Sequence, residues 1–407
     1  MTRTSIQDYV AAIRARYLKA SKTQKRTILD EFCEATGYHR KSAIRTLRHP
    51  PKRSGKHRGR PPEYGTEVAM ALRIAWEATD RICSKRLAPF LPELIPLLER
   101  KGRIKLSPEV RSKLLRISAA TIDRLLARAK REDVRRPHTS RRSSSALKAV
   151  IPIRTFGDWE GVTVGFVELD LVAHCGDSTE GFFLWSLVAI DIVTGWTVCI
   201  PVWGKGQSRV GSATDRLRRQ LPFPLLGIDT DNGGEFINQT LWNYCGQHSI
   251  QFTRSRPYKK NDQAHVEQRN WTAVRRRVGY DRFASKAAYT LLERLYQLAN
   301  LHTNFFQPVC KLVSKERVGA KVHKKYDTAQ TPYQRLLKTG VLDEAHQQML
   351  AAFYRSLDPV ELRTQIDATL EALWKLADHT YPHAAPEADE CEDLPIPQGD
   401  DVITLSP

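Results

Sequence analysis

Three acidic residues in separate segments have the type and spacing needed for phosphoryl-transfer chemistry. Asp231 is followed by Asn-Gly-Gly, and Glu267 comes later with 35 residues between the two acids. Asp170 ends an apolar run and precedes Asp231 by 61 positions. Three carboxylates can gather around two divalent metal ions roughly 3.5–4 Å apart, which activate an attacking oxygen and stabilise a leaving oxygen at phosphorus. Oxygen ligands and a phosphoryl substrate favour Mg²⁺, with Mn²⁺ as a substitute.

Asp170, the Asp-Asn-Gly turn at 231–233 and Glu267 resemble the D,D-35-E pattern of the retroviral-integrase superfamily. The chain most resembles the bacterial branch of that superfamily, the insertion-sequence transposases. Residues 256–268 look like its flexible loop and catalytic helix, and the resemblance covers about 150–305 well. It implies an α/β fold with an RNase H-like integrase core, in which Asp170, Asp231 and Glu267 are catalytic residues and metal ligands.

Two of these acids have an acidic neighbour that could replace them. Glu168 projects from the same strand face as Asp170, because side chains alternate along a strand. The resemblance favours Asp170. Asp229 stands in the same relation to Asp231, and the Asn-Gly turn directly after Asp231 favours the latter. We expect Asp229 either to support the site residues or to be structural.

The segment 264–277 is expected to be a helix that presents Glu267 from its first turn. Its inward-packing residues are predicted to be Val266, Trp271 and Val274. The preceding loop should contact DNA phosphates through Lys259, Lys260 and Asn261. The run 275–277, three consecutive arginines, is more often a solvated basic face, but near the site it could follow a DNA backbone.

The charge of the chain points to a polyanionic partner. The 407 residues carry a net charge of +19, with a pI of about 9.7. Residues 1–150 hold 36 Lys and Arg against 14 Asp and Glu, a local excess of +22. The last 27 residues hold seven acids and no Lys or Arg. A basic N-terminal region of this kind favours double-stranded DNA as the partner.

Several other classes of protein fit the sequence poorly. Seven scattered cysteines without a C-x-x-C motif argue against a disulfide framework or structural zinc. His174 and Cys175 have no further zinc ligands beside them, so we expect them to lie in the core or to support the residues of the site. No run of 18 apolar residues occurs, and we expect a cytoplasmic, nucleoid-associated protein without membrane contact. No phosphate-binding G-x-x-x-x-G-K-[ST] motif occurs, so ATP hydrolysis would require a separate helper ATPase.

Residues 1–49 are expected to form a helix-turn-helix module. Helical patterns before and after Gly37 place a second helix over 39–48, suited to the major groove. Its predicted DNA contacts are Arg40, Lys41 and Arg45. The alternative is a helical hairpin with a solvated basic face. A basic linker follows at 50–65, where Arg-Gly-Arg-Pro resembles an AT-hook and would place Arg58 and Arg60 in a minor groove or against phosphates.

A second helical module is expected over 66–130. Ser107 and Ser118 are good N-caps for two helices, the second over 119–130. This too could be a helix-turn-helix, with Thr121, Arg124 and Arg128 facing DNA, or it could be a packing module. Another basic linker spans 131–150. Two basic linkers between compact modules would suit a protein that wraps along a DNA end.

The catalytic core is expected over 151–306, with strands at 163–171, 181–191, 197–202 and 225–231 and a polar loop from Thr253. A C-terminal region over 307–380 should combine a small β module with helices, divided at Asp358. Its helices could pair with each other or contact another protein. An acidic tail over 381–407 is expected to be disordered.

The resemblance, together with the acidic triple and the basic charge, predicts a DNA transposase. As the resemblance implies, such an enzyme binds the ends of a mobile element, cleaves them and joins them to target DNA. Pairing of two ends implies a homo-oligomer. Two alternatives use the same features. One is a sequence-specific RNase H-like nuclease that cuts without joining, and the other is a non-catalytic DNA-binding regulator derived from a transposase.

Overall fold

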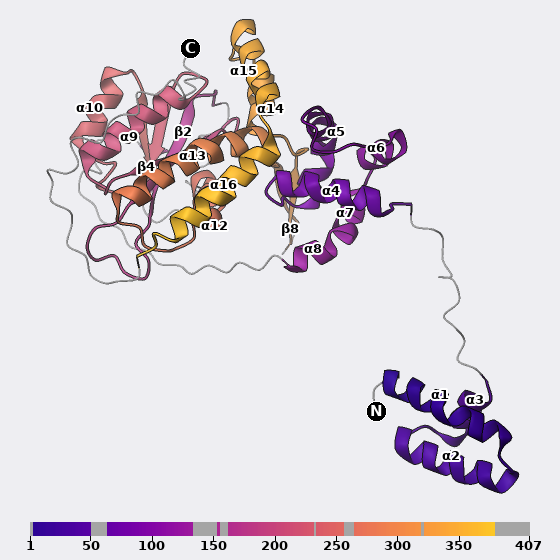
Figure 1. Cartoon of the computed structure of the whole chain (residues 1–407). Helices are drawn as coiled ribbons and strands as arrows, with labels where there is room; N and C mark the ends of the chain where they lie inside the picture. Colours follow the sequence, from indigo (N-terminus) through magenta and orange to yellow (C-terminus); the bar gives the residue numbers. More distant parts are fainter. Residues whose placement is uncertain are drawn as a thin grey trace. The chain divides into compact units, whose positions relative to one another are not determined.

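The computed structural model describes residues 3–49, 63–132, 153–154, 162–231, 233–255, 264–318 and 321–378. The chain divides into two compact units, Met1–Glu63 and Tyr64–Pro407 (Figure 1). Predictions for most of the two basic linkers, for the loop at 256–263 and for the acidic tail concern residues outside the described ranges. Among the described helices, none is both long enough and apolar enough to cross a membrane.

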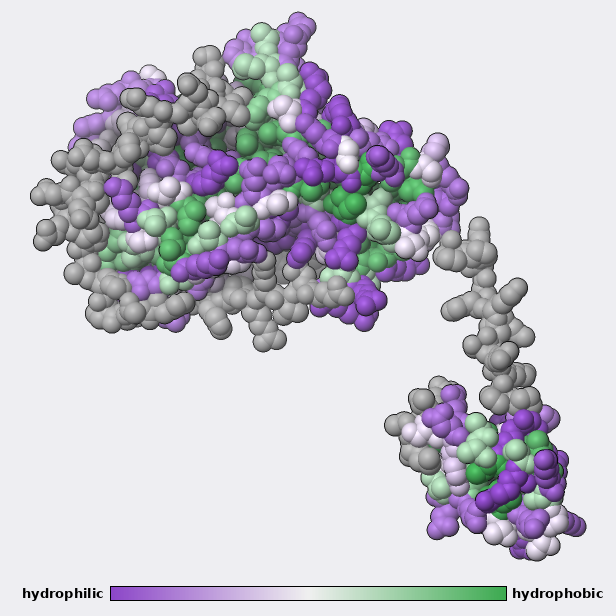
Figure 2. Space-filling model, viewed as in Figure 1, coloured by the Kyte–Doolittle hydropathy of each residue, from purple (hydrophilic) through white to green (hydrophobic). Residues whose placement is uncertain are grey.

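The first unit is a three-helix module with its own hydrophobic core. Its helices are α1 (Arg3–Lys19), α2 (Lys22–Thr36) and α3 (Arg40–Arg48). The expected turn at Gly37 is confirmed, because this glycine ends α2 in the left-handed conformation with φ 71°. The core contains Val10, Tyr17, Ile28, Leu29, Phe32, Ala43 and Leu47. In the view of Figure 2 the surface of this unit is mostly hydrophilic, with hydrophobic residues visible between the helices.

The second unit begins with five helices, α4 (Thr66–Ala78), α5 (Ser84–Arg100), α6 (Pro108–Leu115), α7 (Ala119–Leu125) and α8 (Ala127–Glu132). The predicted N-caps are confirmed: the hydroxyls of Ser107 and Ser118 accept backbone hydrogen bonds in the first turns of α6 and α7. The single helix predicted over 119–130 is wrong. Leu126 ends α7, and its side chain is buried in the core.

A six-stranded mixed sheet forms the centre of the second unit. Its strands are β1 (Ile153–Arg154), β2 (Phe166–Ala173), β3 (Trp185–Asp191), β4 (Thr197–Val202), β5 (Gly227–Thr230) and β6 (Gln251–Ser255), in the order β1-β6-β5-β2-β3-β4. β2, β3 and β4 are antiparallel, whereas β2, β5, β6 and β1 run parallel. The polar loop expected from Thr253 is wrong. Thr253 is buried in β6 and donates its hydroxyl hydrogen to Asp229 at 2.7 Å, which satisfies a polar side chain inside the sheet.

Helices cover this sheet. They are α9 (Gln207–Gln220), α10 (Gln239–Gln247), α11 (Ala264–Arg269), the π-helical η3 (Asn270–Arg275), α12 (Arg276–Val278) and α13 (Lys286–Phe306). Two asparagines of α13 bind the backbone of the edge strand β4. Asn304 exchanges two hydrogen bonds with the amide and carbonyl of Thr197, both at 2.8 Å, and Asn300 does the same with Cys199. α13 therefore closes a sheet edge that would otherwise expose unpaired backbone groups.

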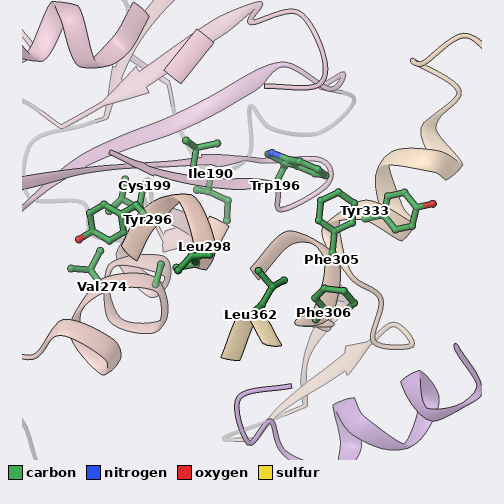
Figure 3. Packing of buried hydrophobic residues seen from close by; sticks show 14 of the residues in the cluster. Ile190, Trp196, Cys199, Val274, Tyr296, Leu298, Phe305, Phe306, Tyr333 and Leu362 are labelled. Atoms are coloured by element: carbon green, nitrogen blue, oxygen red, sulfur yellow. The ribbon is translucent and has the colours of Figure 1, made fainter. Parts of the chain in front are cut away.

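The C-terminal region consists of a β-hairpin, β7 (Leu312–Val318) and β8 (Lys321–Tyr326), and the helices α14 (Pro332–Thr339), α15 (Glu344–Ser356) and α16 (Pro359–Trp374). The predicted β module and the division at Asp358, which caps α16, are confirmed. α16 runs alongside α13 (Figure 1). Trp196, Phe305 and Tyr333 lie close together (Figure 3), with ring centroids 5.6 Å apart for Trp196 and Phe305 and 5.1 Å apart for Phe305 and Tyr333.

Helices α4 to α8 share one continuous hydrophobic core with the sheet and the C-terminal helices. Ion pairs around Asp80 also connect these helices to the rest of the second unit. Asp80, in the turn after α4, pairs with Arg363 of α16 at 2.8 Å. Arg276 of α12 donates to the Asp80 carbonyl at 2.7 Å, and Arg277 lies 3.9 Å from its carboxylate. The solvated basic face predicted for 275–277 is therefore wrong, because the side chain of Arg277 is only 3% exposed.

Candidate active site

Strand register brings Asp170 and Asp231 together. β2 and β5 run parallel, with Leu169 opposite Thr230 in the last described pair. Asp170 is the next residue along β2, and Asp231 is the residue that follows β5. The two acids therefore occupy the same level at the carboxyl end of β5, where the sheet opens and ligands bind in open α/β sheets.

Asp170 is half-buried and is held by two hydrogen bonds. Its Oδ2 accepts from Nδ2 of Asn270 at 2.5 Å, and its Oδ1 accepts from the backbone amide of Leu171 at 2.7 Å. Glu168, the neighbour on the same strand face, is fully buried and accepts a hydrogen bond from the backbone amide of Val266 at 2.8 Å. Glu168 thus fixes the first turn of α11 against β2, while Asp170 is the one of the two acids that solvent reaches.

Asp231 follows β5 directly and is also half-buried. Its Oδ1 accepts the backbone amide of Gly233 at 2.8 Å and so closes a tight turn. A Cβ atom on Gly233 would lie 2.9 Å from Oδ1 of Asp231 and 2.8 Å from Oε1 of Glu235. A larger residue there would push both carboxylates aside, and the same geometry places the carboxylate of Glu235 near Asp231. Asp229 is 1% exposed and takes the hydrogen bond from Thr253 described above, consistent with a structural role.

Glu267 belongs to α11, and its side chain lies outside the described residues. The backbone around it is held on both sides. Val266 donates to Glu168 on β2, and Asn270 donates to Asp170 on the same strand. Positions 267 and 270 are three residues apart, so they share one face of the helix. The backbone of α11 is therefore tied to β2 on both sides of position 267.

The helix after Glu267 departs from the prediction in two ways. A π-helical segment begins at Asn270, and such segments are frequent at functional sites. Val266 and Val274 are buried as expected, but Trp271 is 42% exposed, so its predicted inward packing is wrong. Arg275 is half-buried and donates to the carbonyl of Ala173 at 2.7 Å, a second link between this helix and β2.

A buried hydrogen-bond chain supports β2 behind the site. Nε2 of His174 lies 2.7 Å from the hydroxyl of Ser186 on β3, which in turn lies 2.5 Å from the hydroxyl of Tyr296 on α13. Burial, followed by the charge of Arg275, lowers the pKa of His174 to about 3. This imidazole is neutral at physiological pH and has the core position predicted for it.

The donor chemistry of the site fits a hard divalent cation. Asp170 and Asp231 supply carboxylate oxygens at one level of the sheet edge, and both are open in part to solvent. Within the described ranges, no three His, Cys, Asp or Glu side chains form a metal cluster. The third acid of the predicted set, Glu267, has its side chain outside those ranges.

The residues predicted to contact DNA are dispersed. In the first unit, Lys41 and Arg45 are exposed on α3, but Arg40 forms an ion pair with Asp30 of α2. In the second unit, Arg124 and Arg128 are exposed, and Arg124 donates to the hydroxyl of Thr121 at 3.0 Å. The remaining predicted contacts lie outside the described residues: Arg58, Arg60, Lys259, Lys260 and Asn261. DNA contact by all of these residues remains a prediction.

Sequence reasoning did not assign three residues to the site. They are Asn270, Glu235, and Glu168 in its role of holding the helix. A signal for Asn270 was available, because a residue three positions after Glu267 shares its helix face. Glu168 carried no such signal, since its partner is a backbone amide 98 positions away. Glu235 follows the Asn-Gly-Gly sequence after Asp231; the turn was predicted, but nothing in the sequence indicated that it brings the Glu235 carboxylate near Asp231.

One family model and several solved structures are similar to parts of this chain. Residues 165–260 match the family described as Integrase core domain. The catalytic core domain of BIV integrase covers 43% of this chain and 95% of its own length, with 20% identity and a TM-score of 0.29. The catalytic core domain of HTLV-2 integrase, solved in complex with magnesium, covers 37% of this chain and 92% of its own length, with 17% identity and a TM-score of 0.28.

A full-length relative extends the similarity beyond the core. The uncharacterized protein y4rM of Sinorhizobium fredii is 47% identical over 336 residues, which are 82% of this chain and 95% of y4rM. The predicted α/β integrase core, preceded by helices and followed by a helical region, is confirmed. The chain belongs to the family of y4rM, and within it residues 165–260 form an integrase core domain.

Proposed function

We propose that this protein is a DNA transposase of the insertion-sequence type, which cuts the ends of a mobile element and joins them to target DNA. The observation that carries the proposal is the alignment of Asp170 and Asp231 at one end of the parallel strand pair β2 and β5. The helix that carries Glu267 is hydrogen-bonded to β2 on both sides of that residue.

In this proposal Asp170, Asp231 and Glu267 hold the divalent ions, Mg²⁺ or in its place Mn²⁺. When bound, two such ions supply activation of the attacking oxygen and charge stabilisation at phosphorus. Asn270 orients the Asp170 carboxylate through its 2.5 Å hydrogen bond, and the turn at Gly233 orients Asp231. Glu168 holds the first turn of α11 in place, so the position of Glu267 depends on a buried contact.

The reaction has two phosphoryl transfers, as the resemblance to insertion-sequence transposases implies. Water first attacks the phosphorus at the element end, and the bond to the 3′-oxygen breaks to leave a 3′-OH and a 5′-phosphate. That 3′-OH then attacks a phosphodiester of target DNA, loses its proton and displaces the 3′-oxygen of the target strand. The net charge of +19 supplies the attraction to both DNA substrates, and pairing of two element ends requires a homo-oligomer.

A strand-transfer assay tests this proposal. The full chain, with Mg²⁺ and duplexes that carry the inverted repeats flanking its coding region, is expected to give both cut ends and products joined to a target plasmid. Cut ends without joined products would support a nuclease instead. Tight binding without either product, in Mg²⁺ and in Mn²⁺, would support a regulator that has lost catalysis.

A fragment of residues 1–63 is expected to fold alone and bind duplex DNA. It contains a separate hydrophobic core and holds 16 Lys or Arg against five acids. A fragment of residues 1–150 should be poorly soluble, because α4 to α7 would lose the core that they share with the rest of the second unit. Circular dichroism and binding titrations at about 150 mM salt check both. Equal affinity of the short fragment for terminal-repeat and scrambled duplexes would mean that this module binds DNA without sequence specificity.

A further inference from the structure

The β7–β8 hairpin stands apart from the core. Each strand makes its main contact, among the described elements, with the other strand of the pair. Residues on both strands are exposed, including Val313 at 62% and Tyr326 at 52%. A two-stranded ribbon alone is marginally stable in water, because it has no second layer to bury its faces. An exposed ribbon of this kind therefore suggests a surface that is covered in a complex.

The charges of the hairpin indicate an anionic partner. Residues 312–326 hold five Lys or Arg residues and one acid, Glu316. The register places Lys315 directly opposite Lys324, and Ser314 opposite Lys325. Positive charges gathered on one ribbon repel one another, and a bound anion lowers that repulsion. Lys324 and Lys325 are both exposed, so such an anion can approach from solvent.

The base of the hairpin is fixed to the second unit. Val309 and Gln330 exchange two backbone hydrogen bonds, at 2.9 and 3.1 Å. Asp327 accepts the amide of Lys311 at 2.6 Å and pairs with Arg335 of α14 at 2.7 Å. The ammonium of Lys311 donates to the carbonyl of Ile192, beside β3. The ribbon thus extends from an anchored base, and its orientation relative to the sheet is set by hydrogen bonds.

We infer that the β7–β8 hairpin is a DNA-contact element that binds phosphates of a duplex without regard to sequence. The inference rests on the proposed function, since it takes DNA as the substrate. A two-stranded ribbon has the width to enter a major groove, and lysines on it meet the phosphates that line the groove. Because phosphate contacts carry no sequence information, the hairpin should bind element ends and target DNA equally well.

The test compares charge removal on the hairpin with equal charge removal elsewhere. The full chain is prepared as wild type, as the double variant Lys324→Ser/Lys325→Ser, and as the control Arg355→Ser/Lys375→Ser. The control residues are exposed on α15 and after α16. Affinity for an unrelated duplex is measured as a function of salt. The hairpin variant is expected to flatten the slope of log affinity against log salt by about 1.8, about 0.9 for each lost phosphate contact. The control should leave the slope near that of wild type.

A variant of opposite sign separates contact loss from misfolding. Glu316→Gln removes the one acid of the hairpin and is expected to strengthen binding, whereas Glu371→Gln, exposed on α16, should not. Equal slopes for the hairpin variant and its control would overturn the inference. So would a change of oligomeric state in Lys324→Ser/Lys325→Ser without DNA, which would assign the ribbon to contact with a second copy of the chain. A wild type that binds no duplex would instead contradict the proposed function.

Discussion

Glu267→Gln and Asp231→Asn are each expected to abolish Mg²⁺-dependent end cleavage and strand transfer while leaving DNA binding nearly intact. Each change replaces a carboxylate by an amide of the same size, so the site loses a negative charge needed to hold a divalent cation while its packing is kept. Product formation on labelled element ends, with Mg²⁺ and with Mn²⁺, measures the loss. Binding of the same duplex in chelator measures what is retained.

Asp177→Asn is the matched control for these variants. Asp177 is an exposed acid in the loop that follows β2, seven positions after Asp170, and has no part in the proposed site. It should cut and join at the wild-type rate. Turnover at that rate by Glu267→Gln or by Asp231→Asn would remove the substituted residue from the catalytic set.

Asp80→Asn is expected to destabilise the second unit by about 3 kcal/mol, because it removes the counter-charge of the buried Arg277 and one of the two acids that pair with Arg363. Asp80 is 6% exposed and has a left-handed backbone with φ 57°, which asparagine tolerates, so the change tests the charge alone. Urea denaturation of the full chain measures the loss. Asp177→Asn again serves as the control, with an expected change near zero. A similar urea midpoint for Asp80→Asn and for wild type would assign the stability of the junction to its apolar contacts.

The ion pairs of Asp80 also predict how the stability of the protein changes with pH. Burial raises the pKa of Asp80, but Arg277, Arg363 and Arg276 outweigh burial and lower the pKa to about 2, from an ordinary value of 3.8. A lowered folded-state pKa stabilises the protein above the ordinary value, and this contribution disappears as the pH falls toward 2. The stability difference between wild type and Asp80→Asn should therefore be full above pH 4 and shrink steadily below it. A difference that stays constant down to pH 2 would contradict this assignment.

Features that depend on neighbouring residues could be predicted from the sequence. Ser107 and Ser118 start helices because a hydroxyl satisfies free amides in the first turn. Gly37 ends a helix because it accepts positive φ at little cost. The spacing of Asp170, Asp231 and Glu267 predicted their elements for the same local reason. The turn that follows Asp231 and the helix that carries Glu267 are each formed by residues close to them in the chain.

Only the tertiary structure separated Glu168 from Asp170. The two acids share a strand face, and their different roles come from residues about 100 positions away, the amide of Val266 and the side chain of Asn270. The same reason explains why Thr253 lies in a strand, why Arg277 is buried, and why α4 to α8 share a core with residues far along the chain. Burial and partner choice depend on contacts between distant segments, whereas the sequence by itself determines the caps, the turns and the candidate acids through local chemistry.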